Sequence, residues 1–178
     1  MKRIIMTFIL AATGSAFAFS SETSPYAGEE LNEIKSLSQG EINDLLEGKG
    51  MGFAKAAELN QYPGPRHVLD LAEQLQLSNK QIAQTNRSFE RMREQAVVLG
   101  SQLVEYEREL DTLFSSEQIT VSNLDSLLLQ IGETRARLRG VHLQAHLEMK
   151  HILSRHQVAE YNNLRGYSSA GGRHEHTH

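Results

Sequence analysis

The sequence predicts an all-α protein, organised as a long antiparallel helical hairpin with short helices before and after it. Strong helix formers, namely Leu, Gln, Glu and Ala, dominate the composition, and no stretch alternates polar and apolar residues with a period of two. Two long stretches instead repeat apolar residues at steps of three and four. Proline occurs only at positions 25, 63 and 65, so neither stretch contains a helix breaker.

The N-terminus has the pattern of a secretory signal peptide. Lys2 and Arg3 precede an apolar run from Ile4 to Ala12, and Ala16-Phe17-Ala18 supplies the small residues of a cleavage site. The run is about half of the roughly 20 residues that a membrane-spanning helix needs. We therefore expect cleavage after Ala18 and export to the periplasm, with a retained N-terminal anchor as the alternative.

Composition limits the function classes. Removal of residues 1–18 changes the formal net charge from −4 to −6, which leaves no general attraction to nucleic acid. Cysteine is absent, so the chain forms no disulfides and offers no thiolate ligands. Any metal site must use His, Met, Asp or Glu. After cleavage we expect no membrane-spanning segment.

The rest of the chain divides into three parts: a flexible leader (19–37), a helical hairpin domain (38–166) and a disordered, His-containing tail (167–178). In the domain, Ser38 and Glu41 have the spacing of a capping box for a helix over 41–47, which Gly48 should end. Gly48, Gly50 and Gly52 indicate a tight crossing between helices rather than a phosphate loop, since no strand precedes them. Further short helices are expected over 53–60 and 66–76.

The long helices have the clearest pattern. The first is predicted over 79–113, with Ser78 and Gln81 as its capping box and apolar residues at Phe89, Met92, Ala96, Leu99, Leu103, Tyr106, Leu110 and Leu113. A turn over 114–122 leads to the second, for which we predict a cap at Ser122 with Asp125. Its apolar residues are Leu124, Leu127, Ile131, Leu138, Val141, Ala145 and Ile152. Ser154 and Gln157 then begin a short helix that runs through Leu164 and ends at Gly166.

Three candidate metal ligands share one face of the second long helix. On a helical wheel, His142, His146 and Met149 fall within an arc of about 60° at the edge of the apolar seam, whereas His151 points away. Two histidines spaced i, i+4 can chelate Zn, Ni, Co or Cu, and a thioether favours the softer of these metals. Two ligands do not complete a site, and the candidates for the others are His67, Glu58 and Glu73. The alternative is that the pair is only a solvated flank.

Other patterns carry less chemistry. Leu143 stands where a zincin has glutamate, and no serine lies in a glycine-rich elbow, so we expect no enzyme. His174, His176 and His178 in the tail could bind metal loosely. Arg135, Arg137 and Arg139 indicate a solvated face of ion pairs or, alternatively, a partner-binding stripe. Tyr26, Tyr62, Met51 and Phe53 are candidates for an exposed apolar surface that binds clients.

Two Leu-Ser-x-x-Gln boxes, at 77–81 and 153–157, each open a helix in an exported, cysteine-free chain. In this the chain resembles the periplasmic LTxxQ-motif superfamily of Spy/CpxP-like chaperones, ZraP-like zinc-binding proteins and CnrX-like heavy-metal sensors. The resemblance covers roughly 63–164, with Ser in place of Thr in both boxes. It implies a hooked hairpin that pairs into a dimeric cradle. It also implies His and Met ligands just before the second box, where His142, His146 and Met149 lie. Their spacing is one residue shorter than in the sensors, and the sensors' N-terminal His pair is reduced to His67.

The expected function is that of a periplasmic metal-binding stress, heavy-metal sensor or resistance accessory protein. It would bind a divalent transition metal (Zn, Ni, Co or Cu) through His142, His146, Met149 and His67, without needing it to fold. The first alternative is an ATP-independent chaperone, and the second is a coiled-coil adaptor that modulates an envelope sensor kinase. The expected partners are a second copy of the chain, unfolded periplasmic clients, or a membrane-bound sensor or anti-sigma protein.

Overall fold

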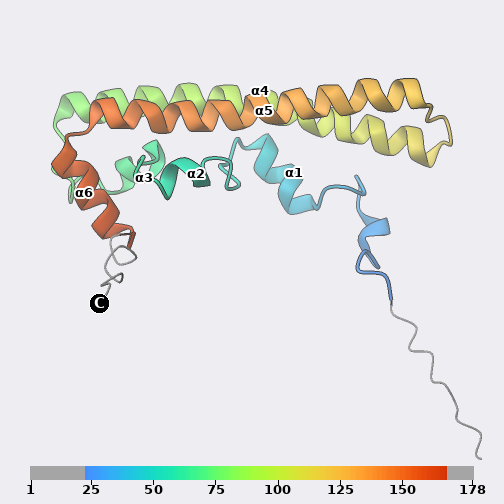
Figure 1. Cartoon of the computed structure of the whole chain (residues 1–178), viewed down its shortest axis with the longest axis horizontal. Helices are drawn as coiled ribbons and strands as arrows, with labels where there is room; N and C mark the ends of the chain where they lie inside the picture. Colours follow the sequence, from blue (N-terminus) through green and yellow to red (C-terminus); the bar gives the residue numbers. More distant parts are fainter. Residues whose placement is uncertain (1–22, 168–178) are drawn as a thin grey trace, which may run out of the picture.

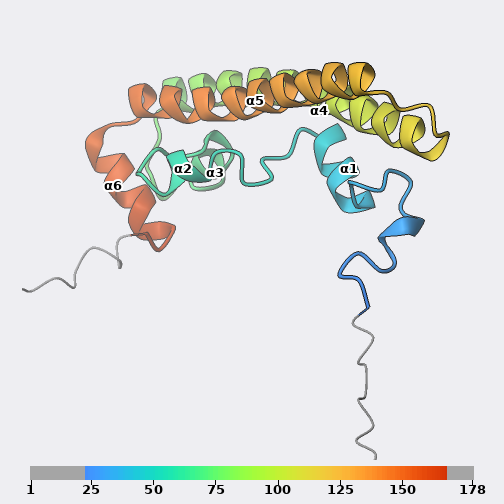
Figure 2. The same ribbon diagram turned by 45° about the vertical axis from the view of Figure 1, so that its right-hand side comes forward.

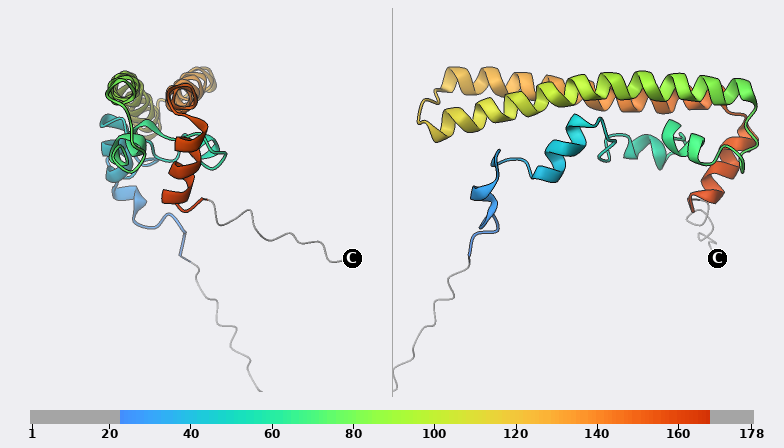
Figure 3. Two further views of the ribbon diagram at one scale, coloured as in Figure 1. Left: turned by 90° about the vertical axis from the view of Figure 1, so that its left-hand side faces the viewer. Right: turned by 180° about the vertical axis from the view of Figure 1, so that it is seen from behind.

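The computed structural model describes residues 23–167, and within them it is all-helical, as predicted (Figure 1). Two long antiparallel helices, α4 and α5, lie side by side, and the shorter helices gather on one side of the pair (Figures 1 and 3). In chain order the elements are η1 (Glu29–Leu31), α1 (Gln39–Leu46), α2 (Lys55–Glu58), α3 (Pro65–Asp70), α4 (Asn79–Ser115), α5 (Val121–Ile152) and α6 (Arg155–Leu164). None of the helices in this part of the chain is long and apolar enough to cross a membrane.

The predicted seams hold the long pair together. Leu99 and Leu103 of α4 and Leu138 of α5 are at most 6% exposed and belong to one apolar cluster. The short helices complete two clusters along the hairpin. The first contains Ile34, Leu37, Ile42 and Leu45 with Ala96, Leu99, Leu103, Val104 and Leu138. The second, near α6, contains Val68, Leu75, Met149, Leu153, Val158 and Tyr161. Each short helix is too brief to be stable alone, so its order comes from this packing.

A close helix crossing lies at Gly100 of α4, where the end of α1 passes over it. A Cβ atom added there would lie 2.1 Å from the carbonyl oxygen of Leu45. We predicted the tight crossing at Gly48, Gly50 and Gly52. That was correct for Gly48, whose added Cβ would lie 3.1 Å from the carbonyl oxygen of Arg93, but Gly50 and Gly52 face open space.

Several predicted boundaries were wrong. Helix α5 begins at Val121 because Thr120, not Ser122, accepts the capping hydrogen bond from the Asn123 amide, and the Thr120 amide in turn donates to the side-chain oxygen of Asn123. The helices expected over 53–60 and 66–76 are shorter, at 55–58 and 65–70. Gln61 and Gln76 have φ values of +66° and +50°, so the backbone leaves the helical region at the end of each stretch.

The predicted leader also extends too far along the chain. Ile34 and Leu37 are 0% and 5% exposed in the first cluster, and the amide of Lys35 donates to Asp111 of α4. The packed part of the chain therefore begins before Ser38. Figure 2 shows this segment beside α1 and beneath the hairpin. The predicted signal peptide (1–18) lies outside the described residues, as does the tail from 168 onward.

Candidate functional site: a buried histidine pair

His142 and His146 lie one turn apart on the face of α5 that the chain between α1 and α4 covers. They are 3% and 9% exposed, and Met149 is fully buried. We predicted that this face lies at the edge of the core and is reachable from solvent. That prediction was wrong, because both histidines are buried. The cover comes from Phe53, which stacks on His142, and from the stretch around Tyr62, which contacts His146.

The ring of His146 is fixed by a backbone carbonyl. Its Nδ1 lies 2.7 Å from the carbonyl oxygen of Tyr62. A carbonyl oxygen can only accept, so Nδ1 must carry the proton, and in the neutral ring Nε2 keeps a free lone pair. This is the tautomer that a metal-binding histidine needs, with the other ring nitrogen donating to a carbonyl.

His142 has a buried nitrogen without a partner. Its ring stacks on Phe53, with centroids 5.7 Å apart and planes inclined by 19°. Its Nε2 is buried and has no hydrogen-bond partner among the described residues. Burial lowers the pKa of His142, and the neighbouring His146 lowers it further. The ring is therefore held in the neutral form, which is the form that binds metals.

A cavity of about 560 Å³ connects the candidate residues. His67, His142 and His146 all line it, and so does Met92 of α4. Met149 does not, because its side chain belongs to the second apolar cluster. We predicted Met149 as the nearby sulfur, but the methionine that lines this cavity is Met92.

Glu58, a predicted candidate ligand, lies beside the pair. Its Oε2 is 3.6 Å from Nδ1 of His146. Its Oε1 accepts hydrogen bonds from the hydroxyl groups of Tyr161 (2.6 Å) and Tyr167 (3.1 Å), with Arg165 Nε at 3.4 Å. The Glu58 carboxylate thus lies beside the protonated Nδ1 of His146, and its hydrogen bond with Tyr161 connects the site to α6.

The remaining candidates lie farther out. His67 stands at the cavity but has a side chain that is 43% exposed, and its Nδ1 is 3.6 Å from Asp70. Glu73 is exposed and does not line the cavity. Within residues 23–167, no group of three or more His, Asp or Glu residues is placed to hold a metal ion. The structure therefore brings together two buried imidazoles, the more exposed His67 and a thioether around one cavity, but not a closed three-residue site of the common kind.

The charges around the cavity are mostly basic. Lys49, Arg66 and Arg93 line it, with Glu47 as the acidic member. Lys49 is paired with Asp44 at 2.8 Å and Arg66 with Asp70 at 3.3 Å, which reduces their repulsion of a cation. A ligand bound here would meet two neutral imidazole nitrogens in basic surroundings.

Comparisons of the chain with family models, curated proteins and solved structures find no match. The resemblance to the periplasmic LTxxQ-motif superfamily stays a prediction, which rests on the two capping boxes in a cysteine-free chain with a predicted signal peptide.

Proposed function

We propose that this protein binds a transition-metal ion through Nε2 of His142 and Nε2 of His146, and that it acts in the cell envelope as a metal-binding stress, sensor or resistance accessory protein. One observation carries the proposal. The buried Nε2 of His142 has no hydrogen-bond partner in the described chain, and it lies one turn from a histidine in the metal-binding tautomer. An unpaired buried polar atom destabilises the fold by about 1–3 kcal/mol, and a bound metal would remove that penalty.

The donor set indicates which metals fit. Neutral imidazoles suit Zn, Ni, Co and Cu, whereas Mg and Ca prefer carboxylate and carbonyl oxygens. The pair would supply two ligands, and His67 or water would supply others. Glu58 and the Tyr62 carbonyl would orient the His146 ring through its Nδ1, the nitrogen that does not bind the metal.

Calorimetric titration with Zn, Ni, Co and Cu tests this proposal. The mature chain should carry His174→Ala, His176→Ala and His178→Ala, so that the tail adds no heat. We expect binding that is lost in the His142→Ala/His146→Ala double variant. The matched control is His151→Ala/His156→Ala, which changes two exposed histidines of the same region and should leave the affinity unchanged. Unchanged affinity in the His142→Ala/His146→Ala variant would overturn the proposal.

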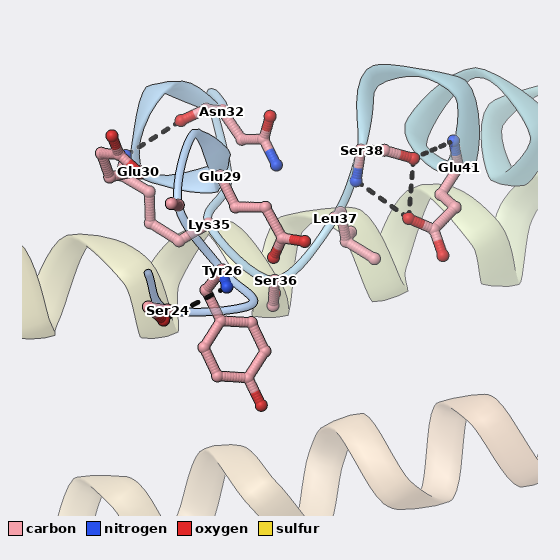
Figure 4. Close-up of a pocket in the computed structure, with 11 residues that line it drawn as sticks. Ser24, Tyr26, Glu29, Glu30, Asn32, Lys35, Ser36, Leu37, Ser38 and Glu41 are labelled. Carbon is pink, nitrogen blue, oxygen red and sulfur yellow. Dashed lines mark hydrogen bonds between the residues drawn. The ribbon is translucent and has the colours of Figure 1, made fainter. Parts of the chain in front are cut away.

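A chaperone is the second candidate, and an exposed apolar surface near the N-terminus favours it. Tyr26 and Leu31 are 70% and 84% exposed. Tyr26 and other residues between 24 and 41, but not Leu31, line an open cavity of about 980 Å³, and Figure 4 shows Tyr26 projecting from this segment toward α5. Apolar side chains beside an open cavity could hold an unfolded client.

Suppression of aggregation tests the chaperone candidate. The mature protein should slow light scattering by a denatured client, and Tyr26→Ser/Leu31→Ser should weaken that effect. Gln130→Ser, a change at a partly exposed polar position of α5, is the control. Absence of protection by the unmodified protein at an equimolar ratio would end this candidate.

A further inference from the structure

We infer that the metal this site selects is monovalent copper, Cu(I), held by Nε2 of His142, Nε2 of His146 and the sulfur of Met92. This inference rests on the proposed function, because it concerns the same cavity. It adds a ligand from α4 and names one metal and one oxidation state. Three observations carry it: the number of ligands, their softness and the charge around them.

The number of ligands is too small for the common divalent sites. Structural zinc takes four protein ligands, and catalytic zinc takes three. No group of three His, Asp or Glu residues is placed to hold a metal in residues 23–167, and the chain has no cysteine. Nickel and cobalt are likewise left with two buried imidazoles and, at most, His67, whose side chain is 43% exposed and has its Nδ1 3.6 Å from Asp70. Cu(I), a closed-shell ion, is stable with two or three ligands, so it needs no further protein group.

The third available donor is soft. Met92 lines the same cavity as the two histidines and is partly buried. Thioethers favour Cu(I) over the harder divalent ions. Met92 lies on α4, whereas the histidines lie on α5, so a shared ion would join the two long helices at this level. No carboxylate is needed among the ligands, and Glu58 is already occupied with Tyr161 and Tyr167.

The charge around the cavity favours an ion of low charge. The ligands themselves are neutral. Of the basic residues that line the cavity, Lys49 is paired with Asp44 and Glu47, and Arg66 with Asp70, which leaves Arg93 as the lining cation without a salt bridge among the described residues. The electrostatic repulsion from these groups acts twice as strongly on a divalent ion as on a monovalent ion, because Coulomb energy is proportional to the ion's charge. The burial of His142 points the same way, since a low-charge ion loses less hydration energy on entering a site of low polarity.

A competition experiment tests the inference. The full mature chain, with the three tail histidines changed to alanine, is titrated anaerobically into a Cu(I)–bicinchoninate complex in ascorbate, and into a chromophoric Zn(II) complex in parallel. We expect Cu(I) to be taken up with an affinity at least about a hundredfold above that for Zn(II). X-ray absorption of the Cu(I) form should show one sulfur and two nitrogen neighbours.

Variants separate this inference from the proposed function. Met92→Leu conserves the side-chain volume, and it should weaken Cu(I) binding by about tenfold or more while leaving Zn(II) affinity unchanged. Met149→Leu, which changes the methionine of the second apolar cluster, is the matched control and should leave Cu(I) binding unchanged. Circular dichroism of each variant checks that it folds.

The possible outcomes distinguish a failure of the proposed function from a failure of the copper inference. If the His142→Ala/His146→Ala variant binds every metal as well as the unmodified chain does, the proposed function fails. If binding depends on the histidines but Zn(II) competes equally with Cu(I), or if Met92→Leu has no effect on Cu(I) and no copper–sulfur signal appears, the copper inference alone fails. A sulfur signal that Met149→Leu removes would assign the ligand to Met149 and also overturn it.

Discussion

The side chains of Gln81 and Gln157 hydrogen-bond to each other, although 76 residues separate them. The side-chain nitrogen (Nε2) of Gln81 lies 2.8 Å from the side-chain oxygen (Oε1) of Gln157. It also lies 2.9 Å from the backbone carbonyl oxygen of Ile152. The Gln157 amide nitrogen donates to the carbonyl oxygen of Leu75 at 3.1 Å. Each glutamine also closes the capping box of its own helix. The two boxes thus hold the starts of α4 and α6 together.

Gln157→Ala should therefore destabilise the fold by about 1–3 kcal/mol, because it leaves the Leu75 carbonyl unpaired and removes one side of a capping box. Urea unfolding followed by circular dichroism measures this loss. Gln144→Ala, at an exposed position of α5, is the control and should change stability by less than about 0.5 kcal/mol. Equal effects of the two changes would contradict the account of the boxes.

Two glycine positions in the long helices should respond in opposite directions. Gly100→Ala places a Cβ atom against the carbonyl oxygen of Leu45 and should destabilise by about 1–3 kcal/mol. Gly140→Ala meets nothing within 4 Å and should stabilise by up to about 1 kcal/mol through helix propensity. Thermal unfolding of both variants checks the pair. A stabilising Gly100→Ala would show that α1 does not pack against α4 as described.

Stability should fall on acidification because of His142. Its pKa is lower in the folded protein than in the unfolded chain, chiefly through burial. Between these two pKa values the unfolded chain binds more protons, so lowering the pH through this window favours unfolding. The free energy of unfolding of the metal-free protein should drop from about pH 8 to about pH 5.5.

His142→Phe isolates that pH effect from the other histidines. Phenylalanine keeps an aromatic ring beside Phe53 and does not titrate. Urea unfolding at both pH values should show a smaller pH dependence in His142→Phe, whatever its absolute stability. His151→Phe, which changes an exposed histidine of α5, should keep the full dependence. An identical pH dependence in all three proteins would exclude His142 as the source.

The expected homodimer should use the outward face of α5. Leu129 and Leu147 are 75% and 51% exposed, and between them lie Gly132 and Gly140, whose missing side chains leave open space. All four fall within an arc of about 80° on a helical wheel, opposite the buried seam. A second copy packed there would bury the apolar surface of Leu129 and Leu147.

Sedimentation velocity tests the dimer. Ala136→Glu, in the middle of that face, should shift the protein toward the monomer, because it buries a charge in the interface. Ser126→Glu, at an exposed position on the flank of the same helix, is the control and should leave the distribution unchanged. A monomeric unmodified protein at about 100 μM would contradict the prediction.

Local patterns predicted most of the fold. The heptad seams and the boxes at Ser38, Ser78 and Ser154 depend on residues a few positions apart, so the sequence shows them directly. The start of α5 was misplaced because Thr120 and Ser122 both have capping side chains, and nothing local decides between them. The crossing at Gly100 depends on where α1 packs, which is tertiary information.

Part of the site was also predictable, because it depends on the spacing of residues within one helix. A wheel of one helix places His142 and His146 together, and it cannot show that residues 53–64 cover them. Met149 was chosen because it shares their helix. Met92 belongs to the seam of the other helix, where its apolar role concealed its position at the cavity. The four-residue spacing from Met92 to Ala96 fits the apolar repeat of the helix, so it does not mark Met92 as a ligand.

The most direct test of the account is the nitrogen-15 spectrum of the imidazole rings during metal titration of the mature, tail-substituted chain. Before metal is added, His146 should show a protonated Nδ1 and an unprotonated Nε2. With Cu(I) or Zn(II), the Nε2 resonances of His142 and His146 should shift together, while those of His151 and His156 stay in place. A shift confined to His67, or saturation without any change at His142 and His146, would contradict it.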